Sequence, residues 1–298
     1  MRVSIAIPFF NNAATLEVAI RSVFAQTLND WELLLIDDGS CDGSLKIAQS
    51  VRDSRVRTFT DGENRGLVYR LNQAAGLARG ELLARMDADD IMHPERLGVQ
   101  SDYLDSHPNI HLTGSAAYII DARNQPVGLR DAEERRSRTG WTFPMLIHPT
   151  VMGRTLWFRD NPYDSRYVRA EDVELWYRTR AHACVKNLRQ PLLFYREAGC
   201  FNLWKYSQSA WTVCKILRRY GPALFGPAGT AKRCAASLLK CGVYGAFAAC
   251  GQEHRLLRTR NRSLTKQEKE DADRTLAIVL NAQIPGMNEP PVCAVRAN

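Results

Sequence analysis

Short apolar segments alternate with amphipathic segments along the first 90 residues, and this alternation restricts the fold more than any other feature. Continuous apolar runs are typical of strands buried on both faces, and apolar residues spaced three or four apart are typical of helices. The expected strands are residues 3–8, 31–36, 56–59 and 82–86, and the helices between them are residues 12–24, 43–51 and 67–78. Strict alternation of this kind indicates a parallel, doubly wound α/β sheet.

The pattern changes after a helix expected near residues 94–106. Shorter apolar runs at 110–120, 126–129 and 150–158 indicate antiparallel additions, followed by a helix at 170–181 and two short strands within 183–196. Beyond residue 200 we expect helices and, from residue 284, a loose tail rich in proline. The expected organisation is a domain at 1–200, a basic helical region at 201–283 and a flexible tail at 284–298.

Positive charge is concentrated in the last third of the chain. Residues 201–298 contain 15 of the 40 Lys and Arg residues but only 6 of the 32 Asp and Glu residues, and aromatic residues lie between the basic ones. Such a segment attracts an anionic surface, and we expect this surface to be a membrane. Nucleic acid is not the expected partner, because no zinc-finger, homeodomain or RNA-recognition signature accompanies the basic segment. A nucleic-acid-binding protein is the non-enzymatic alternative.

Cysteine usage and hydropathy favour a cytoplasmic protein that lies peripherally at the inner face of the cell membrane. The eight cysteines show no C-x-x-C pair and no spacing suited to zinc, so reduced thiols are expected. The apolar stretch at the amino terminus is too short for a signal peptide and fits the first strand. No segment reaches the 18 uncharged apolar residues of a spanning helix, and residues 234–251 suit either a membrane interface or a buried helix.

Three carboxylates, Asp87, Asp89 and Asp90, directly follow the apolar run LLARM. The carboxyl end of a parallel strand is where ligands bind in open α/β sheets. Two carboxylates one residue apart can hold a hard divalent cation, which prefers oxygen ligands. The alternative is an acidic helix start before Pro94, since aspartates stabilise the first turn of a helix.

Three further loops follow expected strands and fall on the same edge. The turn Asp37-Asp38-Gly39-Ser40 can accept hydrogen bonds from a base or ribose, although Asp and Gly also favour a plain turn. Arg65 in an Asn-Arg-Gly loop can reach a diphosphate or remain a surface residue. Residues 8–12 add backbone groups. Together they predict a nucleotide pocket, while the absence of G-x-G-x-x-G and G-x-x-x-x-G-K-[ST] argues against dehydrogenases and P-loop NTPases.

Over residues 2–197 the chain resembles family 2 glycosyltransferases, which have the GT-A nucleotide-diphospho-sugar fold. The matching segments, in order, are VSIAIPFFNN, LLLIDDGSCDGS, ENRGLVYRLNQAAGLARGELLARMDADD, HPERL, HPTVM and AEDVELWYR. The resemblance implies an α/β, GT-A (Rossmann-like) fold with a mostly parallel central sheet flanked by helices. The basic last third then becomes a C-terminal helical appendage.

The resemblance also assigns roles on the donor side. The segment Asp87-Ala88-Asp89 matches the D-x-D motif, in which Asp87 and Asp89 hold Mg²⁺ or Mn²⁺ on the diphosphate of the sugar-nucleotide. Asp90, nearest Pro94, is left to cap the following helix. The donor-binding residues that the resemblance implies are Pro8, Phe9, Asn11, Asp37, Asp38, Arg65, Asp87 and Ala88, with Asp38 as the contact to the base.

The pair Glu171-Asp172 matches the E-D motif of the family. The resemblance makes Asp172 the catalytic base, with Glu171 as the substitute, and one base acting in a single displacement implies inversion at the anomeric carbon. Without the family, an acidic helix start that complements the helix dipole explains the pair. His148, in HPTVM, is either an acceptor or diphosphate contact or a structural residue, and Trp176 is either a sugar platform or part of the core.

These features predict a metal-dependent, inverting glycosyltransferase. It would move one sugar from a nucleotide-diphospho-sugar to a hydroxyl acceptor, expected to be a lipid-linked or cell-surface glycan. The absence of a Q-x-x-R-W motif favours a single addition over polymerisation. A nucleotidyltransferase is the alternative enzyme, but the segment PFFNNAAT lacks the glycine-rich, lysine-bearing loop that would favour it.

Overall fold

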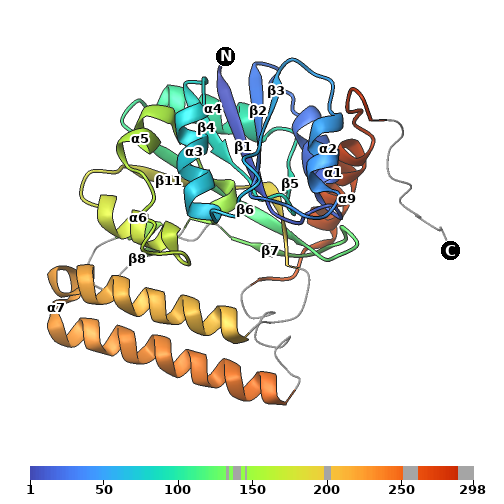
Figure 1. Cartoon of the computed structure of the whole chain (residues 1–298). Coiled ribbons are helices and arrows are strands. Elements are labelled where there is room, and N and C mark those ends of the chain that lie inside the picture. Colours follow the sequence, from blue (N-terminus) through green and yellow to red (C-terminus); the bar gives the residue numbers. More distant parts are fainter. Residues whose placement is uncertain (132–133, 137–141, 145, 198–202, 251–260, 288–298) are drawn as a thin grey trace.

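The computed structural model describes residues 1–298 apart from 132–133, 137–141, 145, 198–202, 251–260 and 288–298. A central nine-stranded sheet lies between layers of helices, and a long helical hairpin lies beneath this α/β body (Figure 1). A separate two-stranded sheet is formed by β8 (Glu134–Arg136) and β9 (Thr142–Pro144).

The first half of the sheet confirms the predicted alternation. Strands β1 (Val3–Phe9), β2 (Trp31–Asp37), β3 (Val56–Phe59) and β4 (Leu82–Arg85) run parallel in the order β3-β2-β1-β4. The connecting helices are α1 (Leu16–Phe24), α2 (Ser44–Ser50) and α3 (Leu67–Leu77). Phe9 pairs with Asp37 and Ala6 with Arg85, so the carboxyl ends of β1, β2 and β4 meet at one edge.

The second half of the sheet mixes strand directions. Strand β10 (Met152–Arg154) is antiparallel to β4 and to β6 (Leu112–Ile120). Strand β11 (Val185–Arg196) is parallel to β6 and antiparallel to β5 (Ile91–Met92), while β7 (Pro126–Arg130) pairs antiparallel with β6. Helix α4 (Arg96–Ser106) joins β5 to β6.

Two sequence-based expectations for this half were wrong. Residues 183–196 form one strand, β11, rather than two, because the register shifts around Pro191 bend the strand without ending it. Proline lacks an amide hydrogen and is accommodated in strands at such bulges. The run at 150–158 is a strand only in part, since it is divided among the 3₁₀ helix η1 (His148–Thr150), β10 and helix α5 (Thr155–Asp160).

Alternate residues of the parallel strands enter two separate cores. Val3, Ile5 and Ile7 pack on the face covered by α1, whereas Ala6 and Leu34 pack on the face covered by α3 and α5. Successive side chains of a strand point to opposite faces, so both faces of these strands are buried. This burial explains the continuous apolar runs of the sequence.

Helix α9 (Lys266–Leu280) packs on the sheet beside α1 and β7, apart from the hairpin. Its apolar face, Ala272, Leu276 and Val279, joins a core with residues of β6 and β11. Ile284, at the start of the predicted tail, is also buried in the main core. The remainder of that tail, residues 288–298, lies outside the described residues.

Helix α7 (Leu203–Ala249) is a hairpin of two antiparallel arms (Figure 1). The break falls at Gly226, whose φ of 69° and ψ of 169° are accessible mainly to glycine, and Pro222 and Pro227 flank it. Tyr206 stacks on Tyr244 across the arms, with ring centroids 4.4 Å apart. In the part of the chain that the structure describes, no helix combines the length and the apolar character that crossing a membrane requires.

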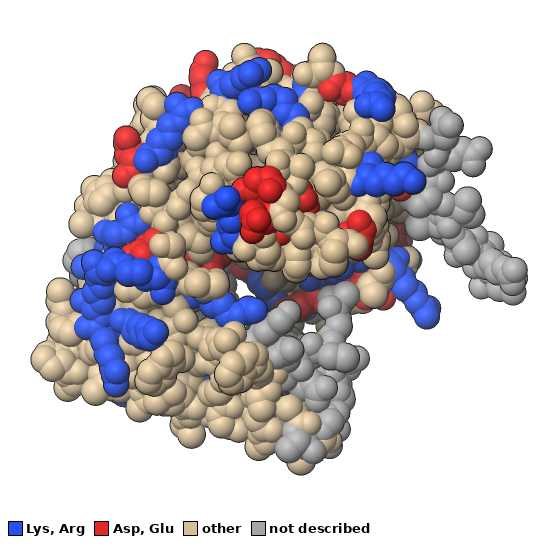
Figure 2. All heavy atoms as spheres, in the orientation of Figure 1, with Lys and Arg blue, Asp and Glu red and all other residues tan. Residues whose placement is uncertain are grey.

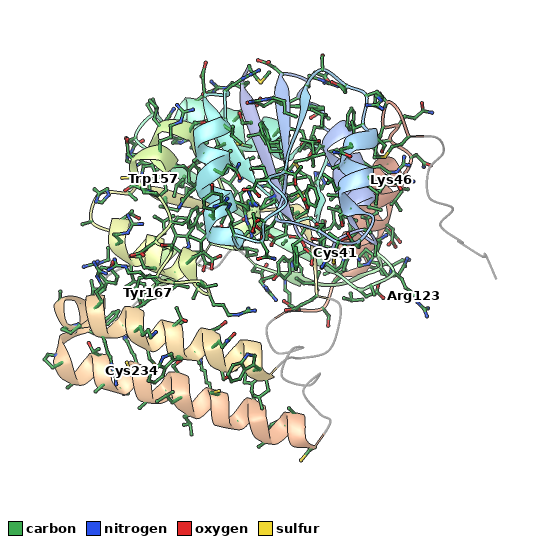
Figure 3. The ribbon with its side chains drawn as sticks, viewed as in Figure 1. Cys41, Lys46, Arg123, Trp157, Tyr167 and Cys234 are labelled. Atoms are coloured by element: carbon green, nitrogen blue, oxygen red, sulfur yellow. The ribbon has the colours of Figure 1, made fainter. Side chains whose placement is uncertain are left out.

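Helix α6 (Glu171–Thr179) is the part of the α/β body that packs against the hairpin. The Tyr220 hydroxyl of α7 donates a hydrogen bond to Glu174 Oε1 at 2.6 Å, and its ring stacks on Tyr177 of α6. Tyr167, labelled in Figure 3 just above the hairpin, forms a hydrogen bond with Arg219 of α7. The helix that begins with Glu171 and Asp172 therefore rests directly on the hairpin.

Candidate active site

Asp38, predicted to contact a nucleotide base, joins three segments of the chain. Its carboxylate accepts hydrogen bonds from Arg65 N at 2.8 Å, from Gly66 N at 3.0 Å and from Arg70 Nε at 2.8 Å. Gly39 brings the turn close to the same loop, because a Cβ at this position would lie 2.9 Å from the Glu63 carbonyl carbon. Asp38 therefore positions the loop that follows β3, and its contact to a base remains a prediction.

The loops after β1 and β2 are also bound to each other. Asn11, at a positive φ of 54°, donates its backbone N–H to Ser40 Oγ and accepts a hydrogen bond from Cys41 N. Asp37 accepts from Ser40 N and from the Thr60 hydroxyl. These contacts give the predicted nucleoside edge a fixed backbone.

The other predicted donor-binding residues are either buried or paired with another side chain. Pro8, Phe9 and Ala88 are buried, and the side chains of Phe9 and Ala88 pack in the core below the edge. Phe10 is exposed instead. Arg65 forms an ion pair with Asp61, with Arg65 Nε 2.7 Å from Asp61 Oδ2. Phe9 and Ala88 are thus placed to support this edge through their backbones, and a diphosphate contact by Arg65 remains a prediction.

Asp87, Asp89 and Asp90 converge after β4, with one oxygen from each within 4.8 Å of the others. Burial raises the pKa of Asp89, and the charge of Asp87 raises it further. Burial, with Asp87 and Asp89 nearby, also raises the pKa of Asp90 well above its ordinary value. Carboxylates that repel one another in this way are the oxygen donors that a divalent cation stabilises, so these residues fit the predicted metal.

Asp90 does not cap a helix, contrary to the expectation from Pro94. Helix α4 begins only at Arg96, and its first turn has no side-chain cap. Asp90 Oδ1 instead accepts a hydrogen bond from Arg196 N at 2.8 Å, and Arg196 Nε donates to the Asp89 carbonyl. Strand β11 therefore anchors the acidic loop. The Asp90 carboxylate binds Arg196 of this strand and not the start of the following helix.

Arg85 is a buried cation between the two acidic segments. Its Nη2 donates a hydrogen bond to Asp87 Oδ1, whereas its Nε and Nη1 have no hydrogen-bond partner among the described residues. Burial raises the pKa of both Glu171 and Asp172, and the positive charge of Arg85 opposes this rise. Arg85 was not predicted as a site residue, although an arginine inside an apolar run that ends in aspartates is a signal for one.

Glu171 and Asp172 begin α6 after Ala170, which has a left-handed backbone conformation with φ of 60°. Burial raises the pKa of Glu171 to about 7, with the Asp172 charge as the next cause. Burial raises the pKa of Asp172 as well. A carboxylate with a raised pKa is a better proton acceptor near neutral pH, as a general base requires.

His148 lies beside this pair, with Nδ1 3.6 Å from Glu171 Oε1 and Nε2 2.8 Å from the Tyr163 hydroxyl. Burial lowers the pKa of His148 well below its ordinary value, so the ring is neutral at pH 7. Trp176 is buried between His148 and Trp157. With 3% of its side chain exposed, Trp176 occupies the core position that the sequence also allowed, and its contact with an acceptor sugar remains a prediction.

A cavity of about 730 Å³ joins the two acidic segments. Asp87 lies on its wall with His148, Glu171 and Asp172, and Ser209 of α7 also lines it. The hairpin therefore contributes to the same cavity as the predicted metal and base residues. Sequence patterns could not reveal this contact, since Ser209 is an ordinary polar residue of a helix.

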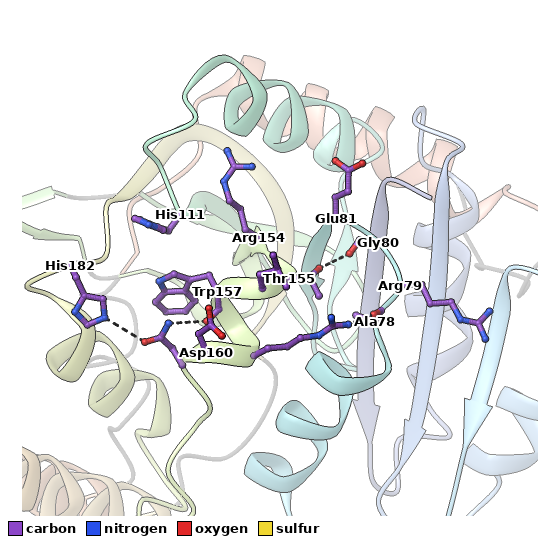
Figure 4. A pocket seen from close by; sticks show the side chains of 13 residues that line it. Ala78, Arg79, Gly80, Glu81, His111, Arg154, Thr155, Trp157, Asp160 and His182 are labelled. Carbon is purple, nitrogen blue, oxygen red and sulfur yellow. Dashed lines mark hydrogen bonds between the residues drawn. The ribbon is translucent and has the colours of Figure 1, made fainter.

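A second cavity, of about 880 Å³, opens at the other end of β4 (Figure 4). It is lined by Gly80 and Glu81, which precede the strand, whereas Asp87 follows it. Two of its three arginines bind backbone carbonyls: Arg159 donates to Ala75 O and Ala78 O, and Arg154 donates to Leu104 O. The smaller cavity, which Asp87, Glu171 and Asp172 line, is therefore the candidate active site.

Comparison with known proteins identifies the family of this chain. Residues 4–180 match the family Glycosyl transferase family 2, which is more than half of the chain. The chain belongs to this family. It is 32% identical to EpsE of Bacillus subtilis over 195 residues, or 59% of this chain and 66% of that protein. It is 30% identical over 181 residues to WfgD of Escherichia coli, a UDP-Glc:alpha-D-GlcNAc-diphosphoundecaprenol beta-1,3-glucosyltransferase, covering 58% of this chain and 68% of that protein.

Solved structures share the fold of this family 2 member. The Staphylococcus aureus TarS fragment 1–349, in complex with UDP-GlcNAc, has a TM-score of 0.59 at 18% identity, covering 73% of this chain and 66% of that chain. The mannosyltransferase PcManGT from Pyrobaculum calidifontis, in complex with GDP-Man and Mn²⁺, has a TM-score of 0.56 at 16% identity, covering 93% and 85%. The predicted family and GT-A fold are thus confirmed.

Proposed function

We propose that this protein transfers one sugar from a nucleotide-diphospho-sugar to a hydroxyl group of a lipid-linked glycan, with inversion at the anomeric carbon. The observation that carries this proposal is the single cavity that brings Asp87, of the acidic loop, together with Glu171 and Asp172. The likeness to WfgD, whose acceptor is a sugar on diphosphoundecaprenol, supports the acceptor class.

On the donor side, the chain provides a rigid edge. The nucleoside would lie across the joined loops after β1 and β2, and the diphosphate would lie at the acidic loop after β4. Asp87 and Asp89 would hold Mg²⁺ or Mn²⁺, which stabilises the negative charge of the departing nucleoside diphosphate. Arg196 holds this loop through the Asp89 carbonyl and the Asp90 carboxylate.

On the acceptor side, Asp172 would accept the proton of the attacking hydroxyl. Burial raises its pKa, which suits this role, while the Val173 N–H and the charge of Arg85 oppose the rise. Glu171 and neutral His148 would orient the hydroxyl from the cavity wall. The hydroxyl oxygen would attack the anomeric carbon from the face opposite the leaving diphosphate. This single displacement gives inversion.

The hairpin would hold the enzyme on an anionic membrane at the cytoplasmic face. Helix α7 contains seven Lys and Arg residues and no Asp or Glu. Exposed apolar side chains accompany this charge, namely Leu203, Trp204, Trp211, Leu238, Leu239 and Val243. Figure 2 shows Lys and Arg atoms gathered where the hairpin meets the α/β body, and no acidic atoms on the visible hairpin surface. Basic and apolar residues together favour binding to anionic lipids.

The test compares donor binding with transfer. A panel of nucleotide-sugars with Mn²⁺ would first identify the donor by thermal stabilisation and hydrolysis. Asp89→Ala should then lose metal-dependent donor binding, whereas Asp172→Asn should retain donor binding and lose transfer to a GlcNAc-diphospholipid or another lipid-linked acceptor. Asp160→Asn, which alters a carboxylate of the second cavity, is the matched control. Normal transfer by Asp172→Asn would show that another group is the base.

A further inference from the structure

Three arginines line the 730 Å³ cavity, and they differ in how their charges are used. Arg85 is bound to Asp87. Arg130 donates to Glu197 Oε1 and to Asn261 Oδ1, and its guanidinium lies over the Tyr195 ring. Arg169 has no hydrogen bond or ion pair with any residue that the structure describes. Among the described residues, Arg169 is therefore the one arginine of the three whose whole guanidinium is unpaired, while the unpaired Nε and Nη1 of Arg85 are buried.

Arg169 lies at the mouth of this cavity on the acceptor side. Its neighbour Val168 lines the cavity and is 72% exposed, which places these residues at the opening. Arg169 also precedes Asp172 by three residues, a separation of at most roughly 11 Å for an extended chain. Both residues line the same cavity, so a ligand that fills it can contact Arg169 and the proposed base together.

The carboxylates of this cavity favour a cation beside any anionic group of the acceptor. Asp87, Glu171 and Asp172 contribute carboxylates to the wall, and His148 is neutral. A phosphate approaching these carboxylates would be repelled unless a positive charge lay next to it. A planar guanidinium suits this task, because it can bind two phosphate oxygens at once.

We propose that Arg169 binds the phosphate group that links the acceptor sugar to its lipid, so that the enzyme selects acceptors carrying a sugar diphosphate. This inference rests on the proposed function and deepens it. The sugar would point inward to Asp172, the diphosphate would lie against Arg169, and the lipid would leave along the hairpin. Ser209 of α7 lines the cavity, so the hairpin forms part of the wall along which the lipid would leave.

The experiment measures binding of a soluble lipid diphosphate to the full chain. The protein is first saturated with Mn²⁺ and the nucleoside diphosphate that stabilises it most, so that the donor diphosphate site is filled. Geranyl diphosphate is then titrated by calorimetry, with geraniol as the uncharged comparison. We expect wild type to bind geranyl diphosphate at least about tenfold more tightly than geraniol, and Arg169→Gln to lose at least about tenfold of that affinity. Arg169→Lys should fall between them, because it keeps the charge but not the planar fork.

The control is Arg166→Gln, which removes an exposed arginine of the same loop that is paired with Asp164. It should bind geranyl diphosphate as wild type does. The proposal is overturned if wild type shows no preference for geranyl diphosphate, or if Arg169→Gln binds it normally. It is also overturned if Arg169→Gln weakens nucleoside diphosphate binding, because Arg169 would then be a donor contact. A variant that lowers only sedimentation with anionic liposomes overturns it too, because Arg169 would then bind lipid headgroups. Failure of any nucleoside diphosphate to bind would instead count against the proposed function.

Discussion

Replacing Glu171 by Gln should make the metal-free protein more stable at neutral and alkaline pH. Burial raises the pKa of Glu171 from 4.5 to about 7 in the folded protein. The folded state therefore holds a proton that the unfolded chain releases, and stability falls as pH rises from the unfolded value through the folded one. Gln has nearly the same shape as the protonated acid and removes this titration.

The size of the effect follows from the two pKa values. The rise of the Glu171 pKa from 4.5 to about 7 corresponds to about 3 kcal/mol of destabilisation of the folded protein once the pH exceeds both values. At pH 5 the penalty is only about 1 kcal/mol, because this pH lies only slightly above the pKa of the carboxyl in the unfolded chain. The advantage of Glu171→Gln over wild type should therefore grow by about 2 kcal/mol between pH 5 and pH 8.

Urea unfolding in EDTA, measured at half-unit steps from pH 5 to pH 8.5, tests this expectation. Glu63→Gln removes the same charge from an exposed side chain and serves as the matched control. Its stability curve should run parallel to that of wild type. If the Glu171→Gln curve is also parallel, Glu171 is not a strained buried acid and the reasoning fails.

Two further changes probe the support of the proposed base. Tyr220→Phe removes the hydrogen bond to buried Glu174 and should lower the free energy of unfolding in urea by about 1–3 kcal/mol. Amide exchange in α6 should become faster. Unchanged exchange there would show that the hairpin does not stabilise this helix. Ala170→Gly should raise stability by about 1 kcal/mol, because glycine adopts the positive φ of 60° without a Cβ penalty, and a lower unfolding midpoint would contradict the strain.

The parallel half of the sheet was predictable because its signals are local. Strands buried on both faces give continuous apolar runs, and β1, β2 and β4 follow this rule closely. The carboxylates at the strand ends were predictable for the same reason. The bent strand β11 was not, since an interior proline usually marks an end, and here a bulge absorbs it.

The partners of the site residues depend on contacts between distant segments. Asp38 meets Arg70 across 32 positions, and Asp90 meets Arg196 across 106. No periodicity or turn preference encodes such pairs. Arg85 and Ser209 were missed on the same grounds, because their importance comes from the neighbours that the fold supplies.

The hydrogen bonds of Asp38 limit how donor preference can be redesigned. This carboxylate holds the loop of Arg65 and Gly66 in place, so exchanging it to recognise a different base would release the loop as well. A redesign has to begin at side chains that face the edge without supporting it. Phe10 meets this condition, because its side chain is exposed beside the fixed backbone of the first two loops.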